Sequence, residues 1–297
     1  MDRIEQMQVL VAVAEEGGFS SAARRLSLSG PAVTRAVSSL EQSLGVQLFK
    51  RTTRRVRITE AGAQYVENVK RILSELTEAE EAVSGTDAVP RGHLVVTAPA
   101  MFGRLHVIPG IATFLKRFPE MTVDALFLDR IVDMLEEGVD VGVRIGKLPD
   151  SSLRARKVAE VRTVLVGAPE YLKANGTPSS PKDLAKHSLI TARTGNFSPT
   201  WRFSAENREI SLRIKPRLSA TSNDAVIEAA INGLGITRAL SYQVAQAVSA
   251  GKLKVLLEEW EQAPIPVNLV HREDRSAPIK VRAFIDWLHD HLKATLG

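Results

Sequence analysis

Apolar residues recur at helical spacing through the first 44 positions of the chain. Residues 2–16 are predicted to form one helix, and Ser20 is a candidate N-cap for a second helix from Ser21 to Leu26. Ser27-Leu28-Ser29 is then a short break in the pattern. The first helix is expected to carry one apolar face, made of Ile4, Met7, Leu10, Val11 and Ala14.

A third helix is predicted to begin at Ser29 or Gly30 and to end before Gly45. Pro31 falls in its first turn, where the missing N–H costs nothing. The apolar residues of this helix recur four, three and four positions apart and should form a buried stripe: Val33, Val37, Leu40 and Leu44. The polar residues off this stripe face solvent or a partner: Thr34, Arg35, Ser38 and Ser39.

Two short helices joined by a tight break are typical of a DNA-binding helix-turn-helix, whose second helix enters the major groove by its N-terminal half. The following segment is strongly basic, with Lys50, Arg51, Arg54, Arg55 and Arg57 around Thr52-Thr53. Residues 24–57 contain eight Lys or Arg and one acid, Glu41. Such a cluster favours a wing that contacts DNA phosphates over the alternative, an αα-hairpin with a solvated basic edge.

We therefore expect the DNA contacts to come from the helix-turn-helix and the basic segment. The candidate DNA-binding residues are Ser20, Ser29, Gly30, Pro31, Ala32, Thr34, Arg35, Ser38, Arg51, Thr52, Thr53, Arg54 and Arg55.

A long helix is predicted from Thr59-Glu60-Ala61-Gly62 to about Gly85. Six of its residues follow a heptad spacing and form one seam: Tyr65, Val69, Ile72, Leu76, Ala79 and Val83. The seam either packs on its own domain or pairs with a second copy of the chain. Dimerisation is the better interpretation, because the small N-terminal domain offers no surface long enough to cover the seam.

Residues 85–92 form a polar hinge, and strands alternate with helices beyond it. The predicted strands are His93–Thr97, Thr122–Leu128, Val139–Ile145, Thr163–Gly167, Ser188–Thr191, Gly235–Ala239 and Val267–His271. The predicted helices are Ile108–Arg117, Ile131–Glu137, Pro169–Ala174, Ala225–Asn232, Tyr242–Ala250 and Ile279–Ala294. This alternation predicts a parallel, doubly wound α/β region.

The composition and the motifs of the chain exclude several classes of functional site. The net charge of +5 suits a negatively charged partner, and the absence of cysteine excludes disulfides, thiolate metal sites and cysteine nucleophiles. His289 and His291 lie two residues apart on a helix and point to different faces, so we expect no metal site. The sequence contains neither a phosphate-loop motif nor a nucleophile elbow, and we predict no enzyme activity and no cofactor. With no signal peptide and no long apolar run, we expect a cytoplasmic protein that does not bind membranes and is nucleoid-associated when bound to DNA.

Residues 2–62 resemble the N-terminal domain of LysR-type transcriptional regulators, through FSSAARRL, SGPAVTRAVSSLEQSLG and LFKRTTRRVRITEAG. The remainder resembles the effector domain of that family through TAPAMFG, LEEGVDVGVRIG and ATSNDAVIEAAINGLGI. The opening TAPAMFG and the closing VRAFIDWL are most similar to the subgroup around the meningococcal regulator CrgA. The chain departs from most relatives at Gly30, where they carry glutamine, at Ala100 and Met101, where many offer a hydroxyl, and at Thr237–Leu240, where many have Leu-Pro.

The resemblance implies an α/β protein with three parts: a winged helix-turn-helix (1–58), a dimerising linker helix and hinge (59–90), and a two-lobed, periplasmic-binding-protein-like effector domain (91–297). Lobe one would hold about 92–162 and 267–297, and lobe two about 163–266. The implied partners are double-stranded promoter DNA, a small-molecule effector, RNA polymerase, and copies of the chain in a dimer or tetramer.

In open α/β sheets, ligands bind beyond the C-terminal ends of the strands, near helix N-termini. This rule and the resemblance give the candidate effector-binding residues Ala100, Met101, Asp129, Arg144, Gly146, Thr191, Arg193, Trp201, Ser222 and Asn223. The arginines favour a small anionic effector, such as an organic acid, and an aromatic effector is the other expectation. Two alternatives stay open: Arg144 forms an internal salt bridge with a nearby Asp, and Trp201 and Phe203 belong to the core.

The sequence therefore predicts a ligand-responsive transcriptional regulator. Two other classes remain as alternatives, namely a DNA-binding architectural protein without a ligand and an enzyme with a fused DNA-binding head.

Overall fold

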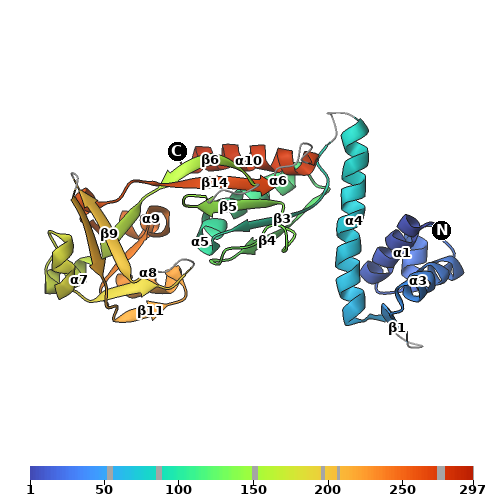
Figure 1. Ribbon diagram of the computed structural model, residues 1–297, viewed down its shortest axis with the longest axis horizontal. Helices are drawn as coiled ribbons and strands as arrows, with labels where there is room; N and C mark the ends of the chain where they lie inside the picture. The colour runs from blue at the N-terminus through green and yellow to red at the C-terminus, as the bar shows by residue number, and fades with distance from the viewer. Residues whose placement is uncertain are drawn as a thin grey trace. The chain divides into compact units, whose positions relative to one another are not determined.

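The computed structural model describes residues 1–51, 56–84, 89–148, 153–194, 198–205, 208–272 and 278–296. The chain divides into two compact units, Met1–Ala88 and Val89–Gly297 (Figure 1). The central wing residues Thr52, Thr53, Arg54 and Arg55 and residues 85–88 of the hinge lie outside the described residues.

The N-terminal unit is helical with a two-stranded ribbon. Its elements are α1 (Arg3–Glu16), α2 (Phe19–Arg25), α3 (Gly30–Leu44), β1 (Phe49–Arg51), β2 (Val56–Ile58) and α4 (Glu60–Ser84). Asp2 and Glu5 form a capping box at the start of α1, which satisfies two free N–H groups. The prediction for Ser20 as a cap is wrong: α2 begins two residues earlier than expected, its N-cap position is Gly18, and Ser20 lies inside the helix.

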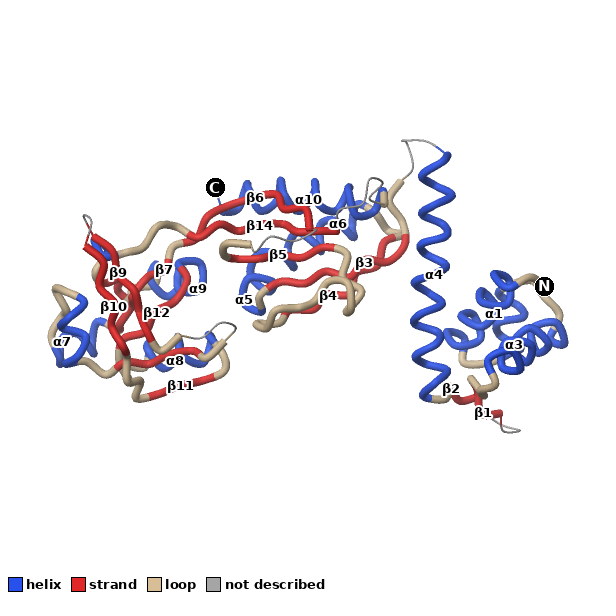
Figure 2. Tube along the Cα trace, viewed as in Figure 1, coloured by secondary structure: helices blue, strands red, loops and turns tan. Residues whose placement is uncertain are grey.

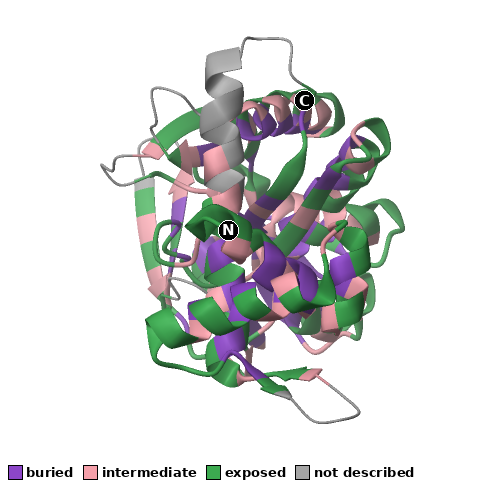
Figure 3. Ribbon diagram, turned by 90° about the vertical axis from the view of Figure 1, so that its right-hand side faces the viewer, coloured by how far each residue is buried: buried purple, intermediate pink, exposed green. Residues whose placement is uncertain are grey.

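The core of this unit lies where α1, α2, α3 and the first turns of α4 meet. In Figure 3 the helices carry purple, buried bands beside green, exposed ones. The predicted apolar face of α1 is only partly correct, because Ile4 is 40% exposed while Val9 and Val13 are buried. Contacts of α1 with three helices explain this, since burial on several sides does not leave one simple stripe. In α3, Val33, Val37 and Leu40 are buried as predicted, but Leu44 in the last turn is exposed.

The long helix α4 is anchored to the unit by its N-terminal half. Val66 and Val69 belong to the core, and Leu73 packs against it. A side chain at Gly62 would place Cβ only 2.1 Å from the Leu48 carbonyl oxygen, so the approach of α4 to the ribbon requires glycine. Val69 is fully buried in its own unit, so its assignment to a dimer seam is wrong.

The C-terminal unit contains two five-stranded sheets and a hairpin (Figure 2). The first sheet, in lobe one, has the order β4-β3-β5-β14-β6, and the second, in lobe two, has the order β11-β8-β12-β7-β13. The strands of lobe one are β3 (Gly92–Ala98), β4 (Met121–Phe127), β5 (Val141–Ile145), β6 (Leu153–Val161) and β14 (Ile265–Arg272). Lobe two holds β7 (Thr163–Gly167), β8 (Leu189–Ala192), β11 (Leu218–Ala220), β12 (Ile236–Leu240) and β13 (Lys254–Leu256), with the hairpin β9 (Thr200–Ala205) and β10 (Arg208–Arg213).

The expectation of purely parallel sheets is wrong. β14 pairs antiparallel with both β5 and β6, and β7 pairs antiparallel with β12 and β13. The cause is the chain path: β6 leaves lobe one through Arg162 into β7, and the chain returns from lobe two directly into β14. Strands that carry the chain out and back must run in opposite directions relative to neighbours joined by helical crossovers.

Helices cover both sheets. They are α5 (Ala100–Phe102), the π-helical turn η1 (Gly103–Val107), α6 (Ile108–Arg117), α7 (Pro169–Asn175), the 3-10 turn η2 (Pro181–Lys186), α8 (Asn223–Ile231), α9 (Ser241–Ser249), the 3-10 turn η3 (Glu258–Trp260) and α10 (Ile279–Leu296). The predicted helix Ile131–Glu137 is absent, and turns occupy that segment. There the Asp133 carboxylate accepts the N–H groups of Leu135 (2.9 Å) and Glu136 (3.1 Å), which favours a turn over a helix.

Candidate functional site

The N-terminal end of α3 lies at the surface of the N-terminal unit. The Ser29 hydroxyl caps the helix by accepting the Ala32 N–H (3.3 Å), which leaves the first turn regular and at the surface. Gly30, Pro31 and Arg35 are exposed, whereas Ala32 and Thr34 are half-buried. Ser20, Ser29 and Ser38 also lie at the surface, on α2, at the cap and on α3. The structure thus gathers the candidate base-reading side chains on one helix, except for Ser20 on the neighbouring helix.

Hydrogen bonds between elements fix the orientation of α3. Arg3 Nη1 donates to Ser43 Oγ (2.6 Å), which joins α1 to the last turn of α3. The Glu41 carboxylate accepts the N–H groups of Leu48 (2.8 Å) and Phe49 (3.1 Å), and so ties α3 to the start of the ribbon. Sequence reasoning missed this role of Glu41, although its place as the one acid in a basic stretch was a signal.

The two strands of the basic ribbon, β1 and β2, belong to the described residues, whereas residues 52–55 between them do not. Its strands pair antiparallel, with Lys50 opposite Arg57 and Arg51 opposite Val56. Lys50 and Arg57 are exposed, as a phosphate-contacting wing requires. The predicted contacts from Arg51, Thr52, Thr53, Arg54 and Arg55 involve side chains outside the described residues.

An ion network joins three helices behind α3. Glu15 on α1 contacts Arg25 on α2 (2.8 Å) and Lys70 on α4 (3.4 Å). Burial alone raises the pKa of the Glu15 carboxyl, but hydrogen bonds and charge from Arg25 and Lys70 outweigh it, and the pKa is lowered. The network therefore holds the helix-turn-helix against the long helix at neutral pH.

The outer part of the α4 seam is partly open. Ile72 is 45% exposed, and Leu76 is half-buried. Tyr65 packs against the core of its own unit. In this it is similar to Val69, whereas Ile72 does not belong to that core. The side chains of Ala79 and Val83 lie outside the described residues.

In the C-terminal unit, Arg144 is the second-last residue of β5 and lies beside the turn segment that follows β4. Its Nη2 donates to the Val132 carbonyl oxygen (2.8 Å), and it forms no salt bridge with an Asp among the described residues. Burial lowers the pKa of its guanidinium, and the nearby charge of Glu137 offsets this only in part. Among the residues that the structure describes, the half-buried guanidinium therefore has the Val132 carbonyl as its hydrogen-bond partner and no ion pair.

The other candidates of lobe one lie at the same sheet edge. The Asp129 carboxylate accepts the Ala100 N–H (3.0 Å), which fixes the start of α5 after β3. Gly146 adopts φ 127°, and its N–H donates to Pro266 across the strand edge. Met101 is buried within a cluster that belongs mainly to lobe two, so its side chain bridges the lobes.

The candidates of lobe two come from the end of β8, from β9 and from the start of α8. Ser222 caps α8 by accepting the Ala225 N–H (3.4 Å), and Asn223 Nδ2 donates to Thr194 Oγ1 (3.4 Å) just beyond β8. Thr191 is buried, whereas Arg193 is exposed. Trp201 is only 2% exposed and lies in the core beneath the β9–β10 hairpin together with Phe203, so its assignment to the effector site is wrong.

The two lobes touch beside these residues. Arg104 Nη2 donates to the Asp224 carboxylate (3.1 Å), and the rings of Phe102 and Tyr242 meet edge to face at 5.2 Å. Burial raises the pKa of the Tyr242 hydroxyl, so this ring stays neutral in the contact. Within the described part of the chain, no cluster of His, Asp and Glu is arranged to hold a metal ion. None of the helices in that part is long and apolar enough to cross a membrane.

A helix-turn-helix unit joined through a long helix to a two-lobed α/β unit defines the class of transcription regulators that couple DNA binding to a sensor domain. The family model of the bacterial regulatory helix-turn-helix protein, lysR family, matches residues 4–63, and that of the LysR substrate binding domain matches residues 87–293. The chain therefore belongs to the LysR family, and it is a DNA-binding transcriptional regulator with an effector-binding domain.

Individual relatives match over nearly their full length. The chain is 34% identical to the HTH-type transcriptional regulator CrgA of Neisseria meningitidis over 290 residues, covering 97% of this chain and 96% of CrgA. It is 31% identical to an uncharacterized HTH-type transcriptional regulator of Haemophilus influenzae over 281 residues, covering 95% and 98% of the two chains. The solved structure of CrgA superposes with a TM-score of 0.62 at 32% identity, covering 97% of this chain and 98% of that chain. Members of this family bind promoter DNA and small-molecule effectors and form oligomers.

Proposed function

We propose that the chain reads promoter DNA through the N-terminal half of α3 and adjusts that binding to a small anionic effector, aromatic or aliphatic, held between its two lobes. The observation that carries the effector part is Arg144, a half-buried guanidinium near the end of β5, with a carbonyl partner and no directly paired acid among the described residues. A carboxylate beside it would offset its desolvation and accept a bidentate pair.

The opposite lobe supplies donors for the same ligand. Ser222 accepts the Ala225 N–H, but the N–H groups of Asn223 and Asp224 form no hydrogen bond with a described residue and could bind an anion at the start of α8. A carboxylate held by Arg144 and by the start of α8 would favour closure of the lobes. Such a ligand shifts the protein only by its difference in affinity between the open and closed states.

On the DNA side, Arg35 is exposed on α3, and its guanidinium suits guanine in the major groove. The wing arginines Arg51, Arg54 and Arg55 would add phosphate contacts. We further propose that the protein acts in the cytoplasm, is nucleoid-associated when bound to DNA, contacts RNA polymerase, and catalyses no reaction; its relatives are regulators, which supports this last point.

One assay separates the two roles: operator binding by fluorescence anisotropy, with and without an effector found by screening small organic acids. Arg35→Ala should weaken operator binding by about 1–3 kcal/mol and leave effector binding unchanged. Arg144→Ala should leave effector-free operator binding unchanged and abolish the response to effector. Arg282→Ala, which removes an exposed arginine of α10, is the matched control and should change neither.

The opposite pattern contradicts the proposal. If Arg144→Ala lowers the melting temperature while the surviving protein still responds to effector, Arg144 has a structural role alone. If no organic acid changes operator binding of the parent protein, the architectural alternative is supported. Turnover of a bound ligand would support the enzyme alternative.

A further inference from the structure

The two lobes of the C-terminal unit are joined by two short crossings of the chain. Arg162 alone separates β6 of lobe one from β7 of lobe two, and residues 261–264 lead from η3 of lobe two back into β14 of lobe one. The strands β6 and β14 that meet these crossings run side by side in Figure 1, with Val161 opposite Ile265. A change in the angle between the lobes therefore has to bend the chain at or beside the two crossings, as hinges do in other two-lobed proteins.

An ion pair joins the two crossings. Arg162 Nη1 donates to Glu261 Oε2 (2.9 Å), although the two residues lie 99 positions apart. The Glu261 side chain is only 12% exposed, and its other oxygen, Oε1, is buried without a hydrogen-bond partner among the described residues. A carboxylate withdrawn from water in this way depends on its cationic partner, so the loss of that partner costs more free energy than at the open surface.

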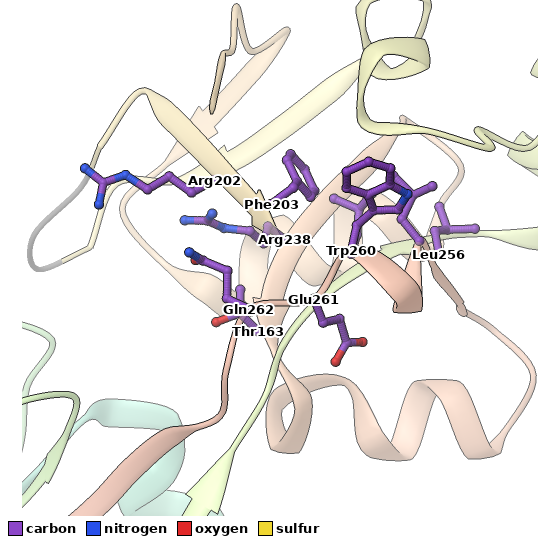
Figure 4. A pocket seen from close by; sticks show the side chains of 10 residues that line it. Thr163, Arg202, Phe203, Arg238, Leu256, Trp260, Glu261 and Gln262 are labelled. Atoms are coloured by element: carbon purple, nitrogen blue, oxygen red, sulfur yellow. The ribbon is translucent and has the colours of Figure 1, made fainter. Parts of the chain in front are cut away.

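The Glu261 carboxylate has other arginines nearby and does not turn toward them. Arg202 and Arg238 line the same small hollow of lobe two as Glu261. In Figure 4 the Glu261 carboxylate points away from both of these guanidinium groups, and its ion pair is with Arg162 on the other crossing. The charge of Glu261 is therefore used between the crossings and not inside lobe two.

The backbone of Arg162 is held as well. Its N–H donates to Ser241 Oγ (3.1 Å), and its carbonyl oxygen accepts the Ser241 N–H (2.8 Å). Ser241 begins α9, and the ring of the next residue, Tyr242, lies against Phe102 of lobe one. Arg162 thus connects the first crossing, the second crossing and a helix that touches lobe one at another place.

We propose that Arg162 and Glu261 form a clamp across the hinge, which fastens the two crossings to each other and so fixes the arrangement of the two lobes. Two separate crossings can bend and twist independently, whereas two crossings joined by their side chains move together. The clamp matters for any ligand that prefers one lobe arrangement, because such a ligand acts only through its difference in affinity between the arrangements. The clamp lies outside the effector site at Arg144, and the proposal does not rest on that site.

The distance between the lobes tests the clamp in the full chain without any ligand. The sequence contains no cysteine, so Lys173→Cys on α7 and Lys293→Cys on α10 place one spin label at an exposed position of each lobe. Double electron–electron resonance measures the distribution of label distances, with labelled chain diluted into unlabelled chain so that distances within one copy dominate. Arg162→Met and Glu261→Met should each broaden this distribution, because each removes the bond between the crossings.

Two further proteins separate the clamp from a loss of stability. Arg162→Met leaves the Glu261 carboxylate unpaired and should lower the melting temperature, whereas the double variant Arg162→Met/Glu261→Met leaves no unpaired charge and should recover part of that loss. The double variant should broaden the distribution no more than the broader single variant, because both changes remove the same contact. Glu160→Gln is the matched control: it breaks the exposed pair with Lys157 within β6 (2.5 Å), beside the crossing, and should keep the parental distribution.

A parental distribution in either single variant would overturn the clamp. This holds even if the melting temperature falls, since the pair would then stabilise the fold without setting the arrangement of the lobes. Equal broadening in the Glu160→Gln control would also reject it, because any charge lost near the crossing would have the same effect. Broadening that adds up in the double variant would mean that Arg162 and Glu261 act through different contacts, which again excludes a clamp.

Discussion

Single residues decide what the recognition helix can read, and Gly30 is the clearest case. It is the first residue of α3, it is exposed, and a Cβ added there would meet no atom within 4 Å. The glycine is therefore not required by packing, in contrast to Gly62, where the Leu48 carbonyl leaves no room. Because it has no side chain, Gly30 offers no polar group at the tip of α3, the helix that we propose to enter the major groove.

Gly30→Gln should fold normally and change the base preference. Its melting temperature should equal or exceed that of the parent, because glycine is the less favourable helical residue. An amide at this position pairs with adenine, so the variant should gain about 1–3 kcal/mol of discrimination at one base pair. Binding measured on a library of operators with single base changes checks this. An unchanged preference at every position would mean that residue 30 does not reach the bases.

At the scale of elements, the helices with one clear periodicity were predictable from the sequence and the irregular ones were not. The bounds of α6 match the expected helix Ile108–Arg117, because a single apolar stripe faces the lobe-one core. The segment Ile131–Glu137 has similar spacing of its apolar residues. There, however, the Asp133 carboxylate accepts the N–H groups of Leu135 and Glu136, which favours a turn. Side-chain competition of this kind is local and leaves no periodic signal.

The strands that the sequence did not reveal share a physical reason. β6 and the hairpin β9–β10 carry many polar residues because one of their faces is open to solvent, so they lack the continuous apolar run of a central strand. The candidate sites divide in the same way. Arg144 and Asn223 follow from the rule about strand ends, whereas the place of Trp201 and Phe203 in the core depends on how the β9–β10 hairpin folds over the sheet. Trp201 was ambiguous because its burial depends on that same hairpin.

The ion network at Glu15 gives a prediction at this scale. Because the folded-state pKa of Glu15 is lowered, its ionised form stabilises the fold above the unfolded pKa of about 4.3, and this stabilisation is lost as the pH falls through the lower folded value. Glu15→Gln should reduce the free energy of unfolding at pH 7 by at most about 1 kcal/mol, since the pairs are exposed. Urea unfolding at pH 7 and in acid checks this, and the parent and variant should converge in acid.

Glu16→Gln is the matched control, because it removes a 3.4 Å contact to Arg25 and leaves the Glu15 network in place. It should cost less than Glu15→Gln at pH 7. A Glu15→Gln deficit that persists unchanged in acid would show that packing of the side chain, and not its charge, holds the three helices together.

At the scale of the whole molecule, α4 packs on its own N-terminal unit and, in the dimer that we propose, also on a second copy of the chain. Val66, Val69 and Leu73 face the core of the N-terminal unit, which leaves Ile72 and Leu76 on a neighbouring strip of α4. A transcription regulator that binds paired half-sites needs two heads held at a fixed spacing. A helix anchored to the head by one strip and to a second copy by the other would transmit the geometry of the sensor to the DNA.

Leu76→Glu tests this division of the helix. A carboxylate placed between two chains would be buried without a partner at a cost of several kcal/mol, so the variant should be monomeric and bind a half-site only weakly. Its melting temperature at the N-terminal unit should change little, because Leu76 lies beyond the residues that form that core. Arg71→Glu, at an exposed position away from the strip, is the matched control and should remain dimeric. Sedimentation velocity measures both proteins at equal concentration, and an intact dimer for Leu76→Glu would assign the strip to packing within one chain.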